Sequence, residues 1–193
     1  MNWERYRWGW VRKSPGLSLV ETMTVLAISL ALASVAVPKI IQTVQRQRLS
    51  ATSRNLAVTL QAARFVAILR QGIYGVQINN NNHTFEVVQW NGSAWQTMTV
   101  AGPNNSTAYD AYSNRKTFNS NVTITTSGVG SDNVIAFNGK GEVLDSTQAT
   151  PTAFTSGSTL PTITFSTAAG SRDLLLTRFG NIRILKHGST VQM

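Results

Sequence analysis

The stretch LSLVETMTVLAISLALASVAV, residues 17–37, decides the organisation of this chain. Its 21 residues include one charged side chain, Glu21. As an α-helix the stretch would be about 31 Å long, close to the hydrocarbon thickness of a bilayer. Basic residues precede it, at Arg5, Arg7, Arg12 and Lys13. Because basic residues stay on the cytoplasmic side, the sequence predicts a membrane-spanning helix with residues 1–16 in the cytoplasm and the rest of the chain across the membrane.

A secretory signal peptide is the alternative interpretation of the same stretch. Ser34-Val35-Ala36 would then provide the small-residue cleavage site. Two features disfavour this interpretation. The stretch is long for a signal peptide, and its carboxylate would cost about 3 kcal/mol in mid-bilayer without serving the function of a signal peptide. Glu21 itself has two interpretations: a functional group within the membrane, or a carboxylate that reaches the nearby interface.

Residues 16–21, Gly16-Leu17-Ser18-Leu19-Val20-Glu21, follow a short basic leader and resemble the processing site of type IV pilins and type II secretion pseudopilins. The resemblance implies that a prepilin peptidase cleaves between Gly16 and Leu17, and that Leu17 becomes an N-methylated N-terminus. It also implies that Glu21 acts in assembly, as the counter-charge of that amine in a neighbouring subunit or in its own helix. The family usually has Phe where this chain has Leu17.

Residues 38–71 are predicted to continue the helix as an amphipathic periplasmic segment, with a kink at Pro38 and a stop at Gly72. One apolar stripe follows the helical period: Leu49, Leu56, Leu60, Ala63 and Ala67. We expect this stripe to pack against the domain that follows. Polar residues such as Ser53, and the five basic residues of Lys39–Arg64, are assigned to the solvent-facing side.

From Gly72 onward the pattern changes to alternation with period two, interrupted by turns. The predicted strands are 73–79, 84–90, 95–100, 122–126, 134–137, 142–144, 162–166, 173–178 and 182–185. Residues 102–120 and 145–160 are predicted loops. Residues 72–193 are therefore predicted to form a β-rich head. The fold class is α+β, with a long N-terminal helix packed on an antiparallel β-sheet.

Three stretches of the head resemble the GspH/FimT family of minor pseudopilins: IAFNGKG at 135–141, Ile163-Thr164-Phe165, and Leu174–Ile184 around Gly180. The resemblance implies a pilin-like fold and a non-enzymatic subunit of the type II secretion pseudopilus, in its tip complex. The implied partners are other pseudopilins or pilins, the prepilin peptidase, the inner-membrane assembly platform and secreted substrates. The implied location is the bacterial inner membrane, as a single-pass protein with a periplasmic head, and then the assembled pseudopilus.

The alternative is a FimT-like minor type IV pilin that acts in pilus biogenesis and DNA uptake. Arg178, Arg183 and Lys186 would then contact DNA phosphates. FimT-like pilins carry a Gly-Arg-x-Arg motif, and Gly180-Asn181-Ile182-Arg183 keeps only its glycine and final arginine. Solubilising charge on a strand is the simpler interpretation. Most of the net charge of +9 also surrounds the apolar segment, which favours a membrane over nucleic acid.

Other residue types give no indication of catalysis. The 193 residues include no cysteine, which excludes disulfides, thiolate zinc sites and a cysteine nucleophile. His83 and His187 lack metal-ligand spacing, and Gly128-Val129-Gly130 lacks the third glycine of a dinucleotide site. Three carboxylates of the head could lie near a metal ion, but they are more simply interpreted as solvated loop acids: Asp132, Glu142 and Asp145. We therefore expect no catalytic residue, no metal site and no cofactor.

Overall fold

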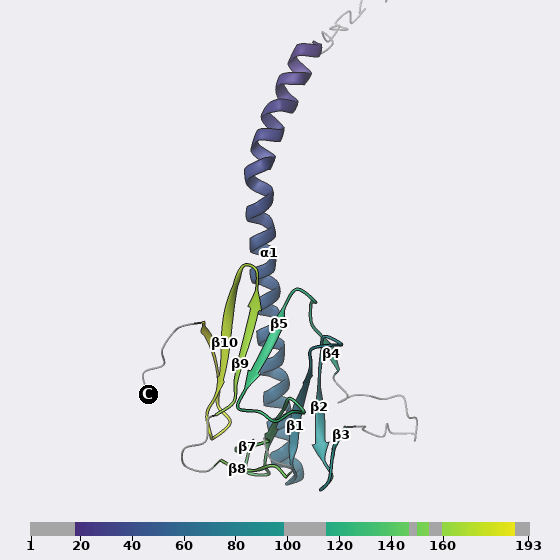
Figure 1. Cartoon of the computed structure of the whole chain (residues 1–193), viewed down its shortest axis with the longest axis vertical. Coiled ribbons are helices and arrows are strands. Elements are labelled where there is room, and N and C mark those ends of the chain that lie inside the picture. The colour runs from purple at the N-terminus through teal and green to yellow at the C-terminus, as the bar shows by residue number, and fades with distance from the viewer. Residues whose placement is uncertain (1–17, 99–114, 147–149, 155–159, 188–193) are drawn as a thin grey trace, which may run out of the picture. The chain divides into compact units, whose positions relative to one another are not determined.

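The computed structural model describes residues 18–98, 115–146, 150–154 and 160–187. The chain forms two compact units, residues 1–41 and 42–193. Helix α1, Leu19–Arg70, belongs to both units (Figure 1). The predicted cleavage site at Gly16 and Leu17 lies outside the described residues, as does the leader 1–16.

In the first unit, every residue from Ser18 to Ile41 is exposed. The large apolar side chains are strongly exposed; Leu19 is 75% exposed and Leu30 is 71% exposed. By length and composition α1 is a candidate membrane span. The helix continues through Pro38, whose ring nitrogen has no hydrogen to donate to the preceding turn. That the span occupies residues 17–37 stays a prediction.

In the second unit, α1 buries one face. The predicted stripe is confirmed, because all of its members are buried: Leu49, Leu56, Leu60, Ala63 and Ala67. The assignment of Ser53 to the solvent-facing side is wrong. Its side chain is fully buried, and its hydroxyl donates to the Ser50 carbonyl at 3.0 Å. Because this bond satisfies the hydroxyl within the helix, the small side chain fits the packed face without a partner from the head.

Helix α1 ends at Arg70, and the residue with left-handed backbone is Gln71, with φ 50°, rather than Gly72. The Gly72 amide donates to the Ala67 carbonyl at 3.3 Å, and Gln71 Nε2 donates to the Ile68 carbonyl at 2.8 Å. These bonds satisfy carbonyls of the last turn, as in a Schellman motif. The Gln71 side chain therefore helps to hold a conformation that glycine adopts more readily.

Two antiparallel sheets complete the second unit. The first has the strand order β3-β2-β1-β6-β7-β8, with β4 also paired to β2, and the second has the order β11-β10-β9-β5. The strands of the first sheet are β1 (Tyr74–Asn79), β2 (Thr84–Trp90), β3 (Trp95–Thr97), β4 (Lys116–Thr117), β6 (Val134–Phe137), β7 (Val143–Asp145) and β8 (Thr152–Ala153). Those of the second are β5 (Thr123–Ser127), β9 (Thr162–Thr167), β10 (Gly170–Leu176) and β11 (Ile182–Lys186).

Every predicted strand has a counterpart among these. Strands β4 and β8 correct the predicted loops, since they lie within 102–120 and 145–160. Each has two residues and exists only through pairing, β4 with β2 and β8 with β7. Two residues are too few to show an alternating pattern in the sequence. Residues 102–114, 147–149 and 155–159 of these predicted loops, and 99–100 of the predicted strand 95–100, lie outside the described residues.

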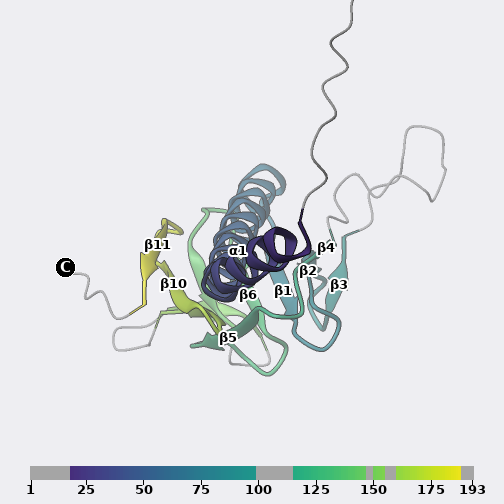
Figure 2. The ribbon, with the colours of Figure 1, turned by 90° about the horizontal axis from the view of Figure 1, so that it is seen from above.

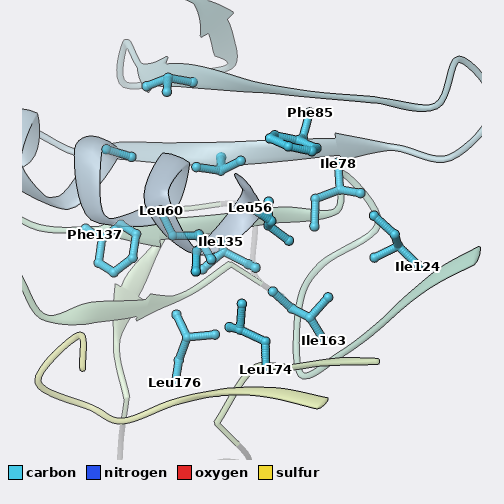
Figure 3. Close-up of a cluster of buried hydrophobic side chains, with 14 of the residues drawn as sticks. Leu56, Leu60, Ile78, Phe85, Ile124, Ile135, Phe137, Ile163, Leu174 and Leu176 are labelled. Atoms are coloured by element: carbon cyan, nitrogen blue, oxygen red, sulfur yellow. The ribbon is translucent and has the colours of Figure 1, made fainter. Parts of the chain in front are cut away.

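The two sheets and the helix share one core (Figure 3). Helix α1 contributes Leu56 and Leu60, which are fully buried. The buried side chains of the sheets include Ile78, Phe85, Ile135 and Phe137 from the first and Ile124, Ile163, Leu174 and Leu176 from the second. Strands β1–β3 lie to one side of α1, and β10 and β11 lie to the other (Figure 2). The predicted α+β fold class, a long N-terminal helix on an antiparallel head, is confirmed.

Candidate functional site

Glu21 lies in the first turn of α1, where a negative charge is favourable because the free backbone amides of the helix point toward it. Its side chain is exposed. Thr24 Oγ1 donates to the Glu21 main-chain carbonyl at 2.8 Å, not to the carboxylate. Within the part of the chain that the structure describes, no donor pairs with the Glu21 carboxylate. A carboxylate in an apolar environment needs a hydrogen-bond donor or a positive charge as its partner. Because the described residues provide none, the Glu21 carboxylate is available to pair with a group outside them.

The hydroxyls around Glu21 are satisfied inside the helix. Thr22 Oγ1 donates to the Leu19 carbonyl at 2.8 Å, and Ser34 Oγ donates to the Ala31 carbonyl at 2.7 Å. Thr24 Oγ1 reaches both the Val20 and the Glu21 carbonyls. These three hydroxyls therefore need neither water nor a second protein chain, and the Glu21 carboxylate is the charged group of the segment that still needs a partner.

In the head, the glycine turns of the resemblance meet at one place. The amide of Val143 donates to the Arg178 carbonyl at 3.0 Å, which joins the first sheet to the β10–β11 hairpin. Arg64 Nε, from α1, donates to the Gly141 carbonyl at 2.9 Å. The assignment of Arg64 to a solvated face is therefore wrong, because the side chain is half-buried between the two turns.

Two of these glycines are required by geometry. Gly141 has φ +78° and Gly180 has φ +75°, both in the left-handed region. A Cβ on Gly180 would lie 2.5 Å from the Gly141 carbonyl oxygen and 2.6 Å from Arg64 Nε. The two turns approach each other so closely that only a hydrogen atom fits at the Cβ position of Gly180. The contact stabilises the fold and provides no catalytic or binding group.

The basic residues proposed for DNA lie on different parts of the β10–β11 hairpin. Arg178 is exposed in the turn, next to Phe179, which is 66% exposed. Arg183 pairs with Leu175, and Lys186 pairs with Arg172. Because alternate residues of a strand point to opposite faces, Arg183 lies on one face of β11 and Lys186 on the other. The structure does not bring the three cations together into one patch.

Lys186 instead joins two other cations. Arg172 stands directly opposite it on β10, and these side chains share a face with the buried Leu174 and Leu176. On that side, Arg46 of α1 completes an open pocket of about 520 Å³ that also includes Leu49 and Ile184. The sequence indicates the local charge of residues 172–193 but not this grouping, because Arg46 comes from a distant helix.

The remaining candidate residues, the histidines and carboxylates, make contacts that stabilise the fold and do not indicate a catalytic or metal site. His187 Nδ1 lies 2.9 Å from both carboxylate oxygens of Asp173, whose Oδ1 accepts a hydrogen bond from Thr164 Oγ1 at 2.8 Å. These contacts attach the end of β11 to β10 and β9. The Glu142 carboxylate accepts from Asn138 Nδ2 within its own turn. In residues 18–98, 115–146, 150–154 and 160–187, no group of three or more metal-ligating side chains is found.

Comparison with known proteins identifies the family. The sequence profile described as Type II transport protein GspH matches residues 52–180, which is more than half of the chain, and the chain belongs to this family. Family membership, together with the fold, confirms the class that the resemblance implies: the chain is a minor pseudopilin of type II secretion. Subunits of this class assemble with other pseudopilins into a filament. No protein of curated function matches the chain by sequence.

The fold resembles that of EpsH, the minor pseudopilin of the type 2 secretion system of Vibrio cholerae. Two EpsH structures have TM-scores of 0.51 and 0.52 at 15% identity, and they cover 74% and 77% of this chain and 99% of EpsH. The type IV minor pilin FimU of Pseudomonas aeruginosa has a TM-score of 0.48 at 14% identity, with 77% of this chain and 96% of FimU covered.

Proposed function

We propose that this chain is a non-enzymatic structural subunit at the tip of a periplasmic pseudopilus and takes part in protein secretion across the outer membrane. The observation that carries the proposal is Glu21. It is the one charge in an apolar helical segment whose described residues are all exposed, and it has no partner there. An exposed apolar helix needs to be covered by lipid or by other helices.

The proposed mechanism is assembly. Before assembly, the segment holds the subunit in the inner membrane as a single-pass protein, with residues 1–16 in the cytoplasm and the head in the periplasm. A prepilin peptidase removes the leader after Gly16, and the new amine of Leu17 is methylated. In the filament, helices of neighbouring subunits then replace the lipid, with the inner-membrane platform as a further partner.

Glu21 would fix the position of each subunit in this filament. The amine of Leu17 is positive and the Glu21 carboxylate is negative, and both would lie in a medium of low dielectric. Breaking a buried pair of this kind costs about 3–5 kcal/mol, so the filament would favour the one axial register in which the charges meet. The β-rich head is left to contact other subunits and secreted substrates.

The substitution Glu21→Gln tests the proposal. The amide has nearly the same volume but no charge, so we expect the variant to enter the membrane fraction as the wild type does and to be lost from pseudopilin filaments by at least ten-fold. The measurement is the amount of this subunit co-purified with sheared filaments from cells that express all pseudopilins. Thr22→Ala is the matched control, since the Thr22 hydroxyl bonds only within the helix. Normal incorporation of Glu21→Gln would contradict the proposed role.

A further inference from the structure

A basic pocket opens between α1 and the β10–β11 edge of the second sheet. Its charged residues are Arg46, Arg172 and Lys186, and its apolar wall is formed by Leu49 and Ile184. The pocket has a volume of about 520 Å³ and is also lined by residues 169–171 at the β9–β10 turn. It is therefore large enough for a phosphate group and part of the molecule that carries it.

Among the residues that the structure describes, no carboxylate forms a salt bridge with any of the three cations. Arg172 and Lys186 are directly opposite each other on antiparallel strands, an arrangement that is destabilising for like charges. Arg46 Nε donates to the Ala169 carbonyl at 3.4 Å, which holds the third guanidinium at the same turn. Within the described part of the chain, no carboxylate lines the pocket. Three cations gathered without an acid indicate an anionic ligand.

Phosphate is the anion that this group of side chains fits best. Arginine presents a planar fork of N–H donors that matches phosphate oxygens, and two of the three cations are arginines. The apolar wall of Leu49 and Ile184 favours a phosphate that carries an apolar body over free inorganic phosphate. Arg46 also follows residue 37, the end of the apolar segment, by only nine residues in the sequence. Basic residues close to a membrane span attract anionic lipids.

We propose that Arg46, Arg172 and Lys186 bind the phosphate of an anionic phospholipid at the membrane surface. The inference rests on the proposed function for one point, that the chain is anchored in a membrane. The bound headgroup would add a polar contact to the anchoring by the apolar segment. This contact would be released when the subunit passes into the filament, so lipid composition would influence how readily the subunit is extracted.

Native mass spectrometry of the full chain in detergent micelles tests the proposal, with phosphatidylglycerol, phosphatidylcholine or inorganic phosphate added. The test variant is Arg172→Gln with Lys186→Gln, and the matched control is Arg54→Gln with Lys140→Gln, which removes two exposed cations outside the pocket. We expect the wild type and the control to retain phosphatidylglycerol in preference to phosphatidylcholine. For the test variant, the affinity should fall about five-fold for each cation removed.

Three results would overturn the proposal. The first is equal retention of phosphatidylglycerol by the test variant and the control. The second is equal retention of the two lipids by the wild type, and the third is displacement of phosphatidylglycerol by inorganic phosphate alone. The far-ultraviolet circular dichroism of each variant establishes that it is folded. Because binding is measured on the unassembled chain, failure here leaves the filament test of Glu21 unaffected, and failure of that test leaves this one unaffected.

Discussion

The packing of two turns in the head requires that residue 180 has no side chain. Its hydrogen atom lets the β10–β11 turn lie against the Gly141 turn and the Arg64 side chain of α1. The sequence marks Gly180 and Gly141 only as turn residues. Their close approach could not be predicted, because it depends on a contact among three segments that are far apart in the chain.

We expect Gly180→Ala to lower the free energy of unfolding by roughly 2–4 kcal/mol. The reasons are the left-handed φ, which costs an alanine about 1–2 kcal/mol, and overlap of its Cβ with the Gly141 carbonyl. The measurement is denaturant unfolding of the full chain in mild detergent. Gly92→Ala is the control for backbone strain alone, since Gly92 has φ +101° and open space around its Cβ position. An equal loss in both variants would show that the contact between the turns does not contribute.

At the scale of elements, the strands that could be predicted most closely are those with a regular pattern. The predicted bounds of β2 and β6 agree with the structure, because each strand is followed by clear turn residues, Asn91-Gly92 after β2 and Asn138-Gly139 after β6. The buried stripe of α1 was equally predictable from its helical spacing. Strands β4 and β8 could not be predicted, because each is determined by pairing with another strand. The left-handed Gln71 could not be predicted either, because glycine adopts this conformation more readily and Gly72 is the next residue.

The β10–β11 hairpin also bears on DNA binding. Arg183 and Lys186 point to opposite faces of β11, and Arg178 lies in the turn, so we expect no dedicated DNA site. Any binding of duplex DNA to the detergent-solubilised full chain at low salt should fall equally in two variants that each lose two cations. These are Arg178→Gln with Arg183→Gln and, as the control, Arg54→Gln with Lys140→Gln. A gel shift that is lost selectively in the first variant would indicate a DNA site on the hairpin.

For the whole molecule, the central prediction concerns its mature form. We expect the protein isolated from membranes to begin at a methylated Leu17, because residues 16–21 resemble a prepilin processing site. Mass spectrometry of the N-terminal peptide measures this directly. A chain that begins at Val37 and is free of the membrane would instead favour secretion after signal-peptide cleavage, and a chain that keeps residues 1–16 would contradict processing at this site.

Of the two candidate sites, Glu21 could be predicted from the sequence and the basic pocket could not. Glu21 can be recognised because a single charge in an apolar stretch is unusual, and its neighbours in the chain define its environment. The basic pocket cannot be recognised in this way, because Arg46 comes from α1 and the pair Arg172 and Lys186 comes from the β10–β11 hairpin, far along the chain. Only the folding of the second sheet against α1 places them around one cavity.

The hydroxyls of Thr22, Thr24 and Ser34 have a consequence for transfer from bilayer to filament. Each is already bonded to a carbonyl of its own helix. A subunit that exchanges lipid neighbours for protein neighbours therefore does not need to break and remake these bonds on the way. The Glu21 carboxylate is the one charged group of this segment, so in the proposed mechanism departure from the lipid is governed mainly by the electrostatic pairing of that carboxylate rather than by rearrangement of these three hydroxyls.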